Sequence, residues 1–281
     1  MGGVRMVVVP YDSGHRDVRM GAGPLHLARA GAADRLRVGG QQVTEEVVEA
    51  AAGWRSEVAT GFELMARTAD RCREAVGRGE VPVVLAGNCG ITVGVVAGVG
   101  AGGRRVGVLW LDAHGDFTTP DTTTSGFLDG MGLSVLTGRC WRRLAAGVPG
   151  HRPVPERAVL LIGARDLSAE EEADLAASAV GRPGMPDMAA AVDRLAATVD
   201  VVHLHVDLDV HDPSIAPANG YAAPGGLSAA DVRQVARTVA GRVPIASVTL
   251  AAYDPSHDRD DRMRDTALDL LTDLSGLLAT S

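Results

Sequence analysis

The feature that most constrains the fold is an alternation between short, continuously apolar runs and longer stretches with helical periodicity. The apolar runs end in Gly, Asp or Pro, and most lack the polar and apolar alternation of a strand that has one face in water. Strands that are apolar on both faces belong in a parallel sheet with helices packed on both sides. The pattern therefore predicts an α/β fold of three layers, α/β/α, with a mostly parallel central sheet.

The same pattern gives the approximate positions of the elements. No internal repeat, low-complexity tract or long linker divides the 281 residues, so we expect one domain over residues 1–281. Several of the predicted helices begin with a Ser or Asp capping signal. The predicted strands cover residues 5–9, 81–85, 105–111, 158–162, 201–207 and 245–251, and the predicted helices cover residues 56–77, 168–177, 188–198, 228–239 and 260–278.

Charge and composition exclude several classes of protein. The formal net charge of -8 disfavours nucleic acid and anionic membranes as partners. No Lys occurs, which excludes a lysine Schiff base and a P-loop lysine. Cys72, Cys89 and Cys140 are odd in number and lack CxxC spacing, which argues against a disulfide framework and a zinc ribbon and fits a reducing cytoplasm. Without a signal-peptide pattern or an apolar run of roughly 20 residues, a cytoplasmic protein is expected.

Two aspartate motifs follow predicted strands. Asp112, His114 and Asp116 come directly after residues 105–111, at the carboxyl end of a strand, where open α/β sheets bind their ligands. Alternate residues of an extended segment point the same way, so these three side chains are expected to converge. Asp207 and Asp209 follow the strand at 201–207 in the same manner.

If the two strands are neighbours, Asp112, Asp116, Asp207 and Asp209 gather about four negative charges, which repel or take up protons unless cations balance them. Two divalent ions balance four carboxylates and can activate a shared water for hydrolysis. The alternative is that the aspartates are ordinary turn and cap residues, which is the common case for an isolated Asp. Two such clusters, each after a buried strand, favour a metal-dependent hydrolase.

Both motifs match those of a known family. Asp112-Ala113-His114-Gly115-Asp116 is followed by Pro120, and Asp207-Leu208-Asp209 is followed by Asp212-Pro213 and by Pro-Gly-Gly at 224–226. Residues 86–90 (AGNCG) stand where the family has Gly-Gly-Asp-His, and residues 125–131 (SGFLDGM) stand where it has Ser-Gly-Asn-Leu-His-Gly-Met. Over nearly its whole length the chain thus resembles the ureohydrolases, which comprise arginases, agmatinases and formimidoylglutamases, and the resemblance implies an arginase-like fold.

The resemblance also implies a set of metal ligands. Asp112 and Asp207 would bridge two Mn²⁺ ions, His114 and Asp209 would complete one site, and Asp116 would belong to the other. The family places a histidine in that second site, whereas this chain has Cys89. A Cys89 thiolate is a softer ligand than imidazole and would favour another ion or occupancy, such as a single Zn²⁺. The alternative for Cys89 is a small buried apolar residue.

Other departures concern the substrate. The resemblance places Thr118 and Phe127 where arginases have asparagines that hold the amino-acid end of the substrate, and Ser168 where they have an aspartate. Ala252 stands where a glutamate usually pairs with the guanidinium, so recognition of L-arginine itself is not expected. The implied substrate-binding residues are Ser125, Thr118, Phe127 and Ser168.

Three further residues are candidates for a role in catalysis or substrate binding. Asp129 stands where arginases have a proton-shuttling histidine, and it either acts as a base or merely enters a helix. His205 shares strand parity with the second motif, which gives it either a catalytic role next to the metals or a place in the core; His203 is expected to be a core histidine. His15, like Arg19, lies in the loop after the first strand and is expected to reach the substrate.

The sequence supports three functions. The leading one is hydrolysis of a linear C-N bond in a small guanidino or amidino compound, with urea-type release. The second is a deacetylase-like amide hydrolase with one metal ion, and the third is a metal-binding homologue without catalysis. By resemblance, we expect a homo-oligomer, either a trimer or a hexamer.

Overall fold

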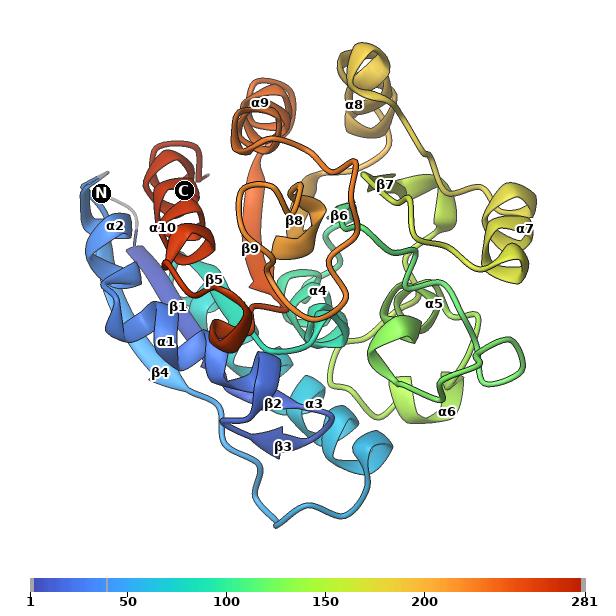
Figure 1. Ribbon diagram of the computed structural model, residues 1–281, viewed down its shortest axis with the longest axis horizontal. Helices are drawn as coiled ribbons and strands as arrows, with labels where there is room; N and C mark the ends of the chain where they lie inside the picture. Colours follow the sequence, from blue (N-terminus) through green and yellow to red (C-terminus); the bar gives the residue numbers. More distant parts are fainter. Residues whose placement is uncertain (1–2, 39, 279–281) are drawn as a thin grey trace.

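The computed structural model describes residues 3–38 and 40–278. In this part of the chain, a central sheet contains seven strands, and every neighbouring pair is parallel. From one edge to the other, as seen in Figure 1, the strands are β4 (Gln42–Val47), β1 (Gly3–Val9), β5 (Glu80–Ala86), β9 (Ile245–Ala251), β8 (Val201–Asp207), β6 (Val106–Leu111) and β7 (Val159–Ile162). A small antiparallel hairpin follows β1 and consists of β2 (Tyr11–Asp12) and β3 (His15–Arg16).

All six predicted strands lie in this sheet, within one or two residues of their predicted ends. The strand that the sequence did not predict is β4, at the edge of the sheet. Its sequence, QVTEEV, is largely polar and its side chains are mostly exposed, so it carries none of the apolar signal used for prediction. Charged side chains on an edge strand discourage pairing with another chain.

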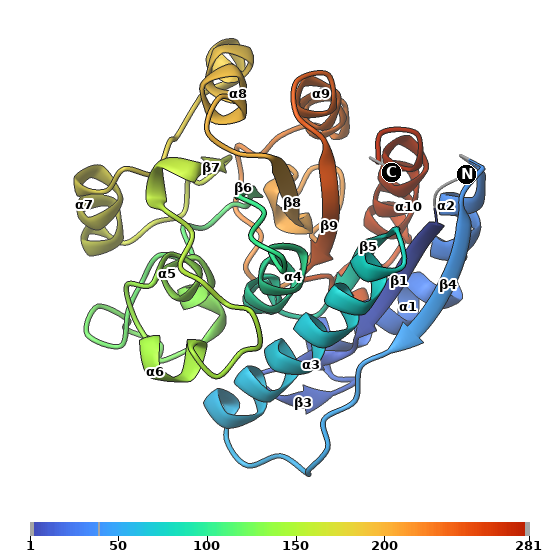
Figure 2. The same ribbon diagram turned by 180° about the vertical axis from the view of Figure 1, so that it is seen from behind.

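Helices cover both faces of the sheet (Figure 1, and from behind in Figure 2), which confirms the α/β/α prediction. One face is covered mainly by α3 (Glu57–Gly77), α4 (Thr92–Val99) and α5 (Gly132–Thr137), with α6 (Arg142–Ala145) beyond them. Helices α1 (Gly23–Arg29), α2 (Ala32–Val38), α8 (Met188–Ala196), α9 (Ala229–Ala240) and α10 (Arg262–Ser275) cover the other, and α7 (Ala169–Ala177) lies beside β7.

Helix α4 was not predicted, because each of its residues is buried and its sequence TVGVVAGV has no apolar periodicity. Two glycines on it contact α3. A Cβ at Gly94 would overlap the carbonyl oxygen of Met65, and a Cβ at Gly98 would lie 2.6 Å from the Cβ of Cys72. The missing side chains therefore let the two helix backbones approach closely.

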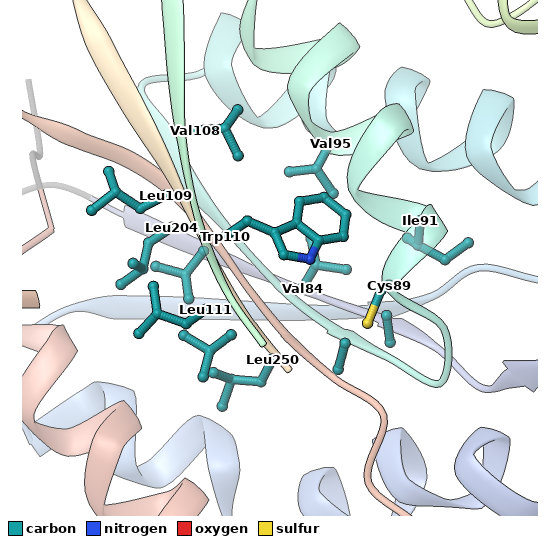
Figure 3. Packing of buried hydrophobic residues seen from close by; sticks show 14 of the residues in the cluster. Val84, Cys89, Ile91, Val95, Val108, Leu109, Trp110, Leu111, Leu204 and Leu250 are labelled. Atoms are coloured by element: carbon teal, nitrogen blue, oxygen red, sulfur yellow. The ribbon is translucent and has the colours of Figure 1, made fainter. Parts of the chain in front are cut away.

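The core continues from the sheet into the helices on both faces. Figure 3 shows Trp110 of β6 beside Val84 of β5 and Val95 of α4, with Cys89 at the margin of this group. Trp110 is fully buried and packs over the imidazole of His205, with ring centroids 4.0 Å apart. This packing fixes the orientation of an imidazole directly beneath the carboxyl edge of the sheet.

Since all strands run in one direction, their carboxyl ends lie at one edge of the sheet. The four central strands, β5, β9, β8 and β6, end there at Ala86, Ala251, Asp207 and Leu111. Cys89 and both aspartate motifs follow three of these ends, and Ala252 follows the fourth. The fold therefore brings together the segments that the sequence singled out. None of the described helices is long and apolar enough to span a membrane.

Candidate metal centre

The ends of β6 and β8 form a buried group of acidic and imidazole side chains. Asp112, His114 and Asp209 each offer a ligand atom within 4.8 Å of the other two. The Nδ1 atom of His114 lies 3.2 Å from Asp112 Oδ1 and 3.4 Å from Asp209 Oδ2. Carboxylate and imidazole donors at such spacing suit a divalent transition metal ion. The sequence predicted that Asp112, His114 and Asp116 converge. Asp112 and His114 do lie together, but the third member of this group is Asp209 rather than Asp116.

The chain reaches this geometry through turns rather than through extended strands. The backbone bends after Asp112, whose carboxylate accepts a hydrogen bond of 2.7 Å from the His114 amide. Asp116 has a left-handed conformation, with φ of 48°, that few non-glycine residues adopt. Beyond Asp207 the chain forms a 3₁₀ turn (Leu208–Val210), which carries Asp209. The expectation that alternate positions of an extended segment align these side chains was therefore wrong in its geometry.

Burial and mutual repulsion favour protonation of the carboxyl groups at the ends of β6 and β8. Burial, with neighbouring carboxylates, raises the pKa of Asp116 and of Asp207 well above the ordinary value. Burial also raises the pKa of Asp112. At His114 burial lowers the pKa, but Asp112 and its acidic neighbours outweigh it and raise the pKa to about 9. Divalent cations meet the same electrostatic demand without protonation.

Several supporting residues were not singled out from the sequence. Asn219 donates its amide to Asp209 Oδ2 at 3.1 Å and to the Ala252 carbonyl at 2.8 Å, which fixes the carboxylate. The Arg165 guanidinium donates to backbone carbonyls on three segments, including those of Asp209 at 2.9 Å and Ala223 at 2.7 Å. Both residues lie outside the two aspartate motifs.

The position of Cys89 defines a second group of donors. Its thiol donates to Asp207 Oδ2 at 3.0 Å, and burial together with the nearby carboxylates raises its pKa well above the ordinary value. Cys89, Asp112 and His205 each offer a ligand atom within 4.8 Å of the other two. His203, two residues earlier on β8, lies in the core, where its Nδ1 atom is 2.8 Å from Ser247 Oγ. The prediction of a core histidine at His203 is confirmed.

The donors of both groups fit the divalent ions that the acidic motifs suggest. Carboxylates and imidazole surround the first position, and the second adds a thiol. Two buried atoms near the second position, Asp116 Oδ2 and His205 Nε2, have no hydrogen-bond partner within residues 3–38 and 40–278. Buried polar atoms without partners are costly, and coordination of a cation would satisfy both of them.

A cavity of about 560 Å³ opens over this edge of the sheet. Thr118, Ser125, Phe127 and Ser168 line it, as expected for residues that contact a substrate. His15 does not line it: its side chain is exposed and stacks on Trp54, with ring centroids 4.8 Å apart. The geometry gives no support to a substrate contact by His15, whereas its neighbour Arg19 lines the cavity.

Asp129 also lines the cavity and is held by two hydrogen bonds. Its carboxylate accepts from the Gly90 amide at 2.9 Å and from the Asn88 side chain at 2.8 Å. Burial raises the pKa of Asp129 to about 8, although both hydrogen bonds act in the opposite direction. Asn88 donates further to Asp12, which pairs with Arg19 at 2.7 Å. The carboxyl of Asp129 is therefore fixed in position and suited to exchange a proton near neutral pH.

The lining of the cavity is strongly acidic. Its basic and imidazole side chains are Arg19, which pairs with Asp12, and His114, which pairs with Asp112. Six carboxyl groups line it, on Asp116, Asp129, Asp166, Glu171, Asp207 and Asp209. This excess suits cations, both as metal ions and as the charged part of a substrate.

Comparisons with known proteins agree with this geometry. A family model described as "Arginase family" matches residues 3–276. The arginase of Bacillus caldovelox is 29% identical over 97% of this chain and 98% of its own length. The N(omega)-hydroxy-L-arginine amidinohydrolase of Streptomyces lavendulae is 32% identical over 72% of this chain and 71% of its own. The crystal structure of the Bacillus cereus arginase superposes with a TM-score of 0.88 at 27% identity and covers 98% of both chains.

Proposed function

Because the chain belongs to the arginase family, whose members hydrolyse guanidino compounds, we propose that it cleaves a linear C-N bond of a guanidino or amidino compound other than L-arginine. The observation that carries the proposal is the buried group formed by Asp112, His114 and Asp209 at the floor of an acidic cavity. In this reaction water adds to the guanidino or amidino carbon and the C-N bond breaks, which releases an amine together with urea from a guanidino compound or an amide from an amidino compound.

We propose that the chain holds two divalent ions. Asp112 and Asp207 would contribute carboxylates to the pair, and His114 with Asp209 would supply the remaining donors of the first ion. Metal ions bound there would supply the Lewis acidity that makes water a nucleophile at neutral pH. Mn²⁺ suits the first position, whose donors are carboxylate oxygens and one imidazole. Arg165 and Asn219 keep Asp209 in place.

Proton transfer is assigned to Asp129. Its carboxyl faces the same cavity as His114 and Asp116, and Asn88 and Gly90 hold it in place. A carboxyl in this position can take a proton from the attacking water and return it to the leaving amine. Asn88 connects it to Asp12 and Arg19 at the rim of the cavity.

The walls of the cavity argue for a substrate other than an α-amino acid. Thr118, Phe127 and Ser168 occupy the positions where the resemblance expects asparagine or aspartate, and Ala252 offers no carboxylate. Phe127 and Tyr221 form an aromatic wall, with ring centroids 6.2 Å apart. The acidic lining attracts the guanidinium, and the aromatic wall suits an apolar or flat group at the other end.

The direct test is a urea-release screen of purified protein, loaded with Mn²⁺ alone and with Mn²⁺ and Zn²⁺ together, against guanidino acids, guanidino amines and N-hydroxylated guanidines. We expect urea from at least one of them and little from L-arginine. The Asp209→Asn variant should lose this activity, because it removes a buried carboxylate from the metal group. Asp121→Asn, which changes an exposed aspartate, serves as the matched control and should keep it.

Two outcomes contradict the proposal. Cleavage of amides but not of guanidino compounds, with one zinc ion per chain and no second metal ion, would favour the deacetylase-like alternative. Metal-loaded protein that is inert across the whole panel would favour a homologue without catalysis.

Assembly into a trimer or hexamer stays a prediction that sedimentation velocity tests.

A further inference from the structure

The second group of donors contains an imidazole that the family resemblance does not assign to the metals. His205 lies on β8, one pleat step before Asp207, and is fully buried. One of its ring nitrogens lies within 4.8 Å of Cys89 Sγ and of an Asp112 carboxylate oxygen. Donor atoms that bind one ion through bonds of about 2.0 to 2.3 Å lie at comparable distances from one another.

The surroundings of His205 fix which nitrogen is available. Nδ1 lies 2.8 Å from Thr92 Oγ1, at the start of α4, and Trp110 packs on the ring face. Nε2 is buried and has no hydrogen-bond partner in the described part of the chain. A histidine that binds a metal commonly donates its other ring N-H to an oxygen of the protein, which fixes the tautomer. Thr92 Oγ1 is placed to accept that bond, which leaves the Nε2 lone pair free.

Further carboxylates line the same cavity as Cys89. Cys89 Sγ lies 3.0 Å from Asp207 Oδ2, and Asp116 Oδ2 is buried without a partner among the residues that the structure describes. Trp110 Nε1 donates to Asp112 Oδ2 at 3.0 Å, so the same indole that packs on His205 also orients the carboxylate common to both groups. Sulfur, nitrogen and oxygen donors therefore meet in one buried place.

We infer that His205 Nε2 and Cys89 Sγ together bind the second ion, so that an imidazole on β8 replaces the one that the family places at position 89. The inference rests on the proposed function, because it adds a ligand to the same metal pair. Thiolate and imidazole donors select Zn²⁺, Co²⁺ or Fe²⁺ over Mn²⁺. The chain thus holds two unlike ions, a harder one at His114 and a softer one at His205.

The test is titration of chelator-treated protein with Co²⁺, followed by absorption. Wild-type protein should bind two equivalents, one of which produces a thiolate-to-cobalt charge-transfer band in the near ultraviolet. Cys89→Ser should lose the band. His205→Gln should weaken binding of that equivalent by about 100-fold or more and leave the other unchanged. His203→Gln, which alters the other buried histidine of β8, is the matched control and should titrate like wild type.

Two further variants extend the test, and the first of them keeps it decisive if His205→Gln folds poorly. Thr92→Val retains the imidazole but removes its partner, and should weaken the same equivalent by about 10-fold. Cys89→His combined with His205→Gln should regain the second equivalent without the charge-transfer band. Elemental analysis after dialysis against equal Mn²⁺ and Zn²⁺ should find one zinc per chain in wild type and none in Cys89→Ser or His205→Gln.

The inference is overturned if His205→Gln binds both equivalents with wild-type affinity. Its failure is distinct from failure of the proposed function. Protein that binds both ions in the predicted way but releases no urea contradicts the function and leaves His205 as a ligand. Protein that releases urea while His205→Gln retains the second ion contradicts the ligand role alone.

Discussion

Substitution of Gly94 by alanine tests whether the close contact of α3 and α4 shapes the metal centre. A Cβ at this position would overlap the carbonyl oxygen of Met65 and lie 2.9 Å from its carbonyl carbon. Both are backbone atoms, so the helices have to move apart. Overpacking of this kind costs about 3 kcal/mol, and the better helix propensity of alanine offsets about 1 kcal/mol of it. We expect a net loss of about 2 kcal/mol in the free energy of unfolding.

The matched control is Gly77→Ala at the end of α3, where no atom lies within 4 Å of the added Cβ. This variant should gain about 0.5 kcal/mol from reduced backbone freedom. Urea unfolding of metal-free protein measures both, and each kcal/mol corresponds to roughly 2 °C in Tm at this chain length. Gly94→Ala should also weaken the second metal site, because Thr92 begins α4. Equal stability of the two variants would show that the contact between α3 and α4 tolerates a Cβ at Gly94.

Three further predictions concern single side chains. Arg165→Met should lower the free energy of unfolding by about 2 to 3 kcal/mol, because it removes donors to the Asp209 and Ala223 carbonyls. It should also weaken metal binding at the first site. Denaturation measures the first effect and metal titration the second. Asp129→Asn should lower kcat by about 100- to 10,000-fold with unchanged metal content; wild-type kcat would exclude its role. Asp212 has its pKa lowered to about 2, first by Ser214 and then by the Gly225 and Gly226 amides. The Asp212 carboxylate therefore contributes fully to stability above its pKa in the unfolded chain, about 3.9, and the contribution is lost as the pH falls through about 2. The difference in unfolding free energy between wild type and Asp212→Ala should shrink over that pH range.

The sheet was predictable because its central strands are buried on both faces and therefore apolar throughout. The edge strand β4 was not, since its exposed side chains are selected for solubility rather than for burial. Helix α4 escaped prediction for the opposite reason: burial on every side removes the periodicity that identifies a helix. Both elements were missed because the order of polar and apolar residues depends on how a segment is buried as well as on its backbone conformation.

The first metal group was predictable because its donors belong to two short motifs, each of which follows a buried strand. Asn219 and Arg165 were not, because each contacts Asp209 from a loop outside the two motifs, Asn219 from 10 residues away and Arg165 from 44. The pairing of His205 with Cys89 also needed the structure, since strand parity gives the direction of a side chain but not its distance from a residue on another strand. His15 shows the converse, because a loop at the correct edge of the sheet need not turn toward the cavity.

The most direct test of the metal centre is anomalous scattering from crystals grown with Mn²⁺ and Zn²⁺, measured at both absorption edges. We predict one peak between Asp112, His114 and Asp209, strongest for manganese, and a second between Cys89, Asp112 and His205, strongest for zinc. Ordered side chains at these positions without an anomalous peak between them would contradict the account.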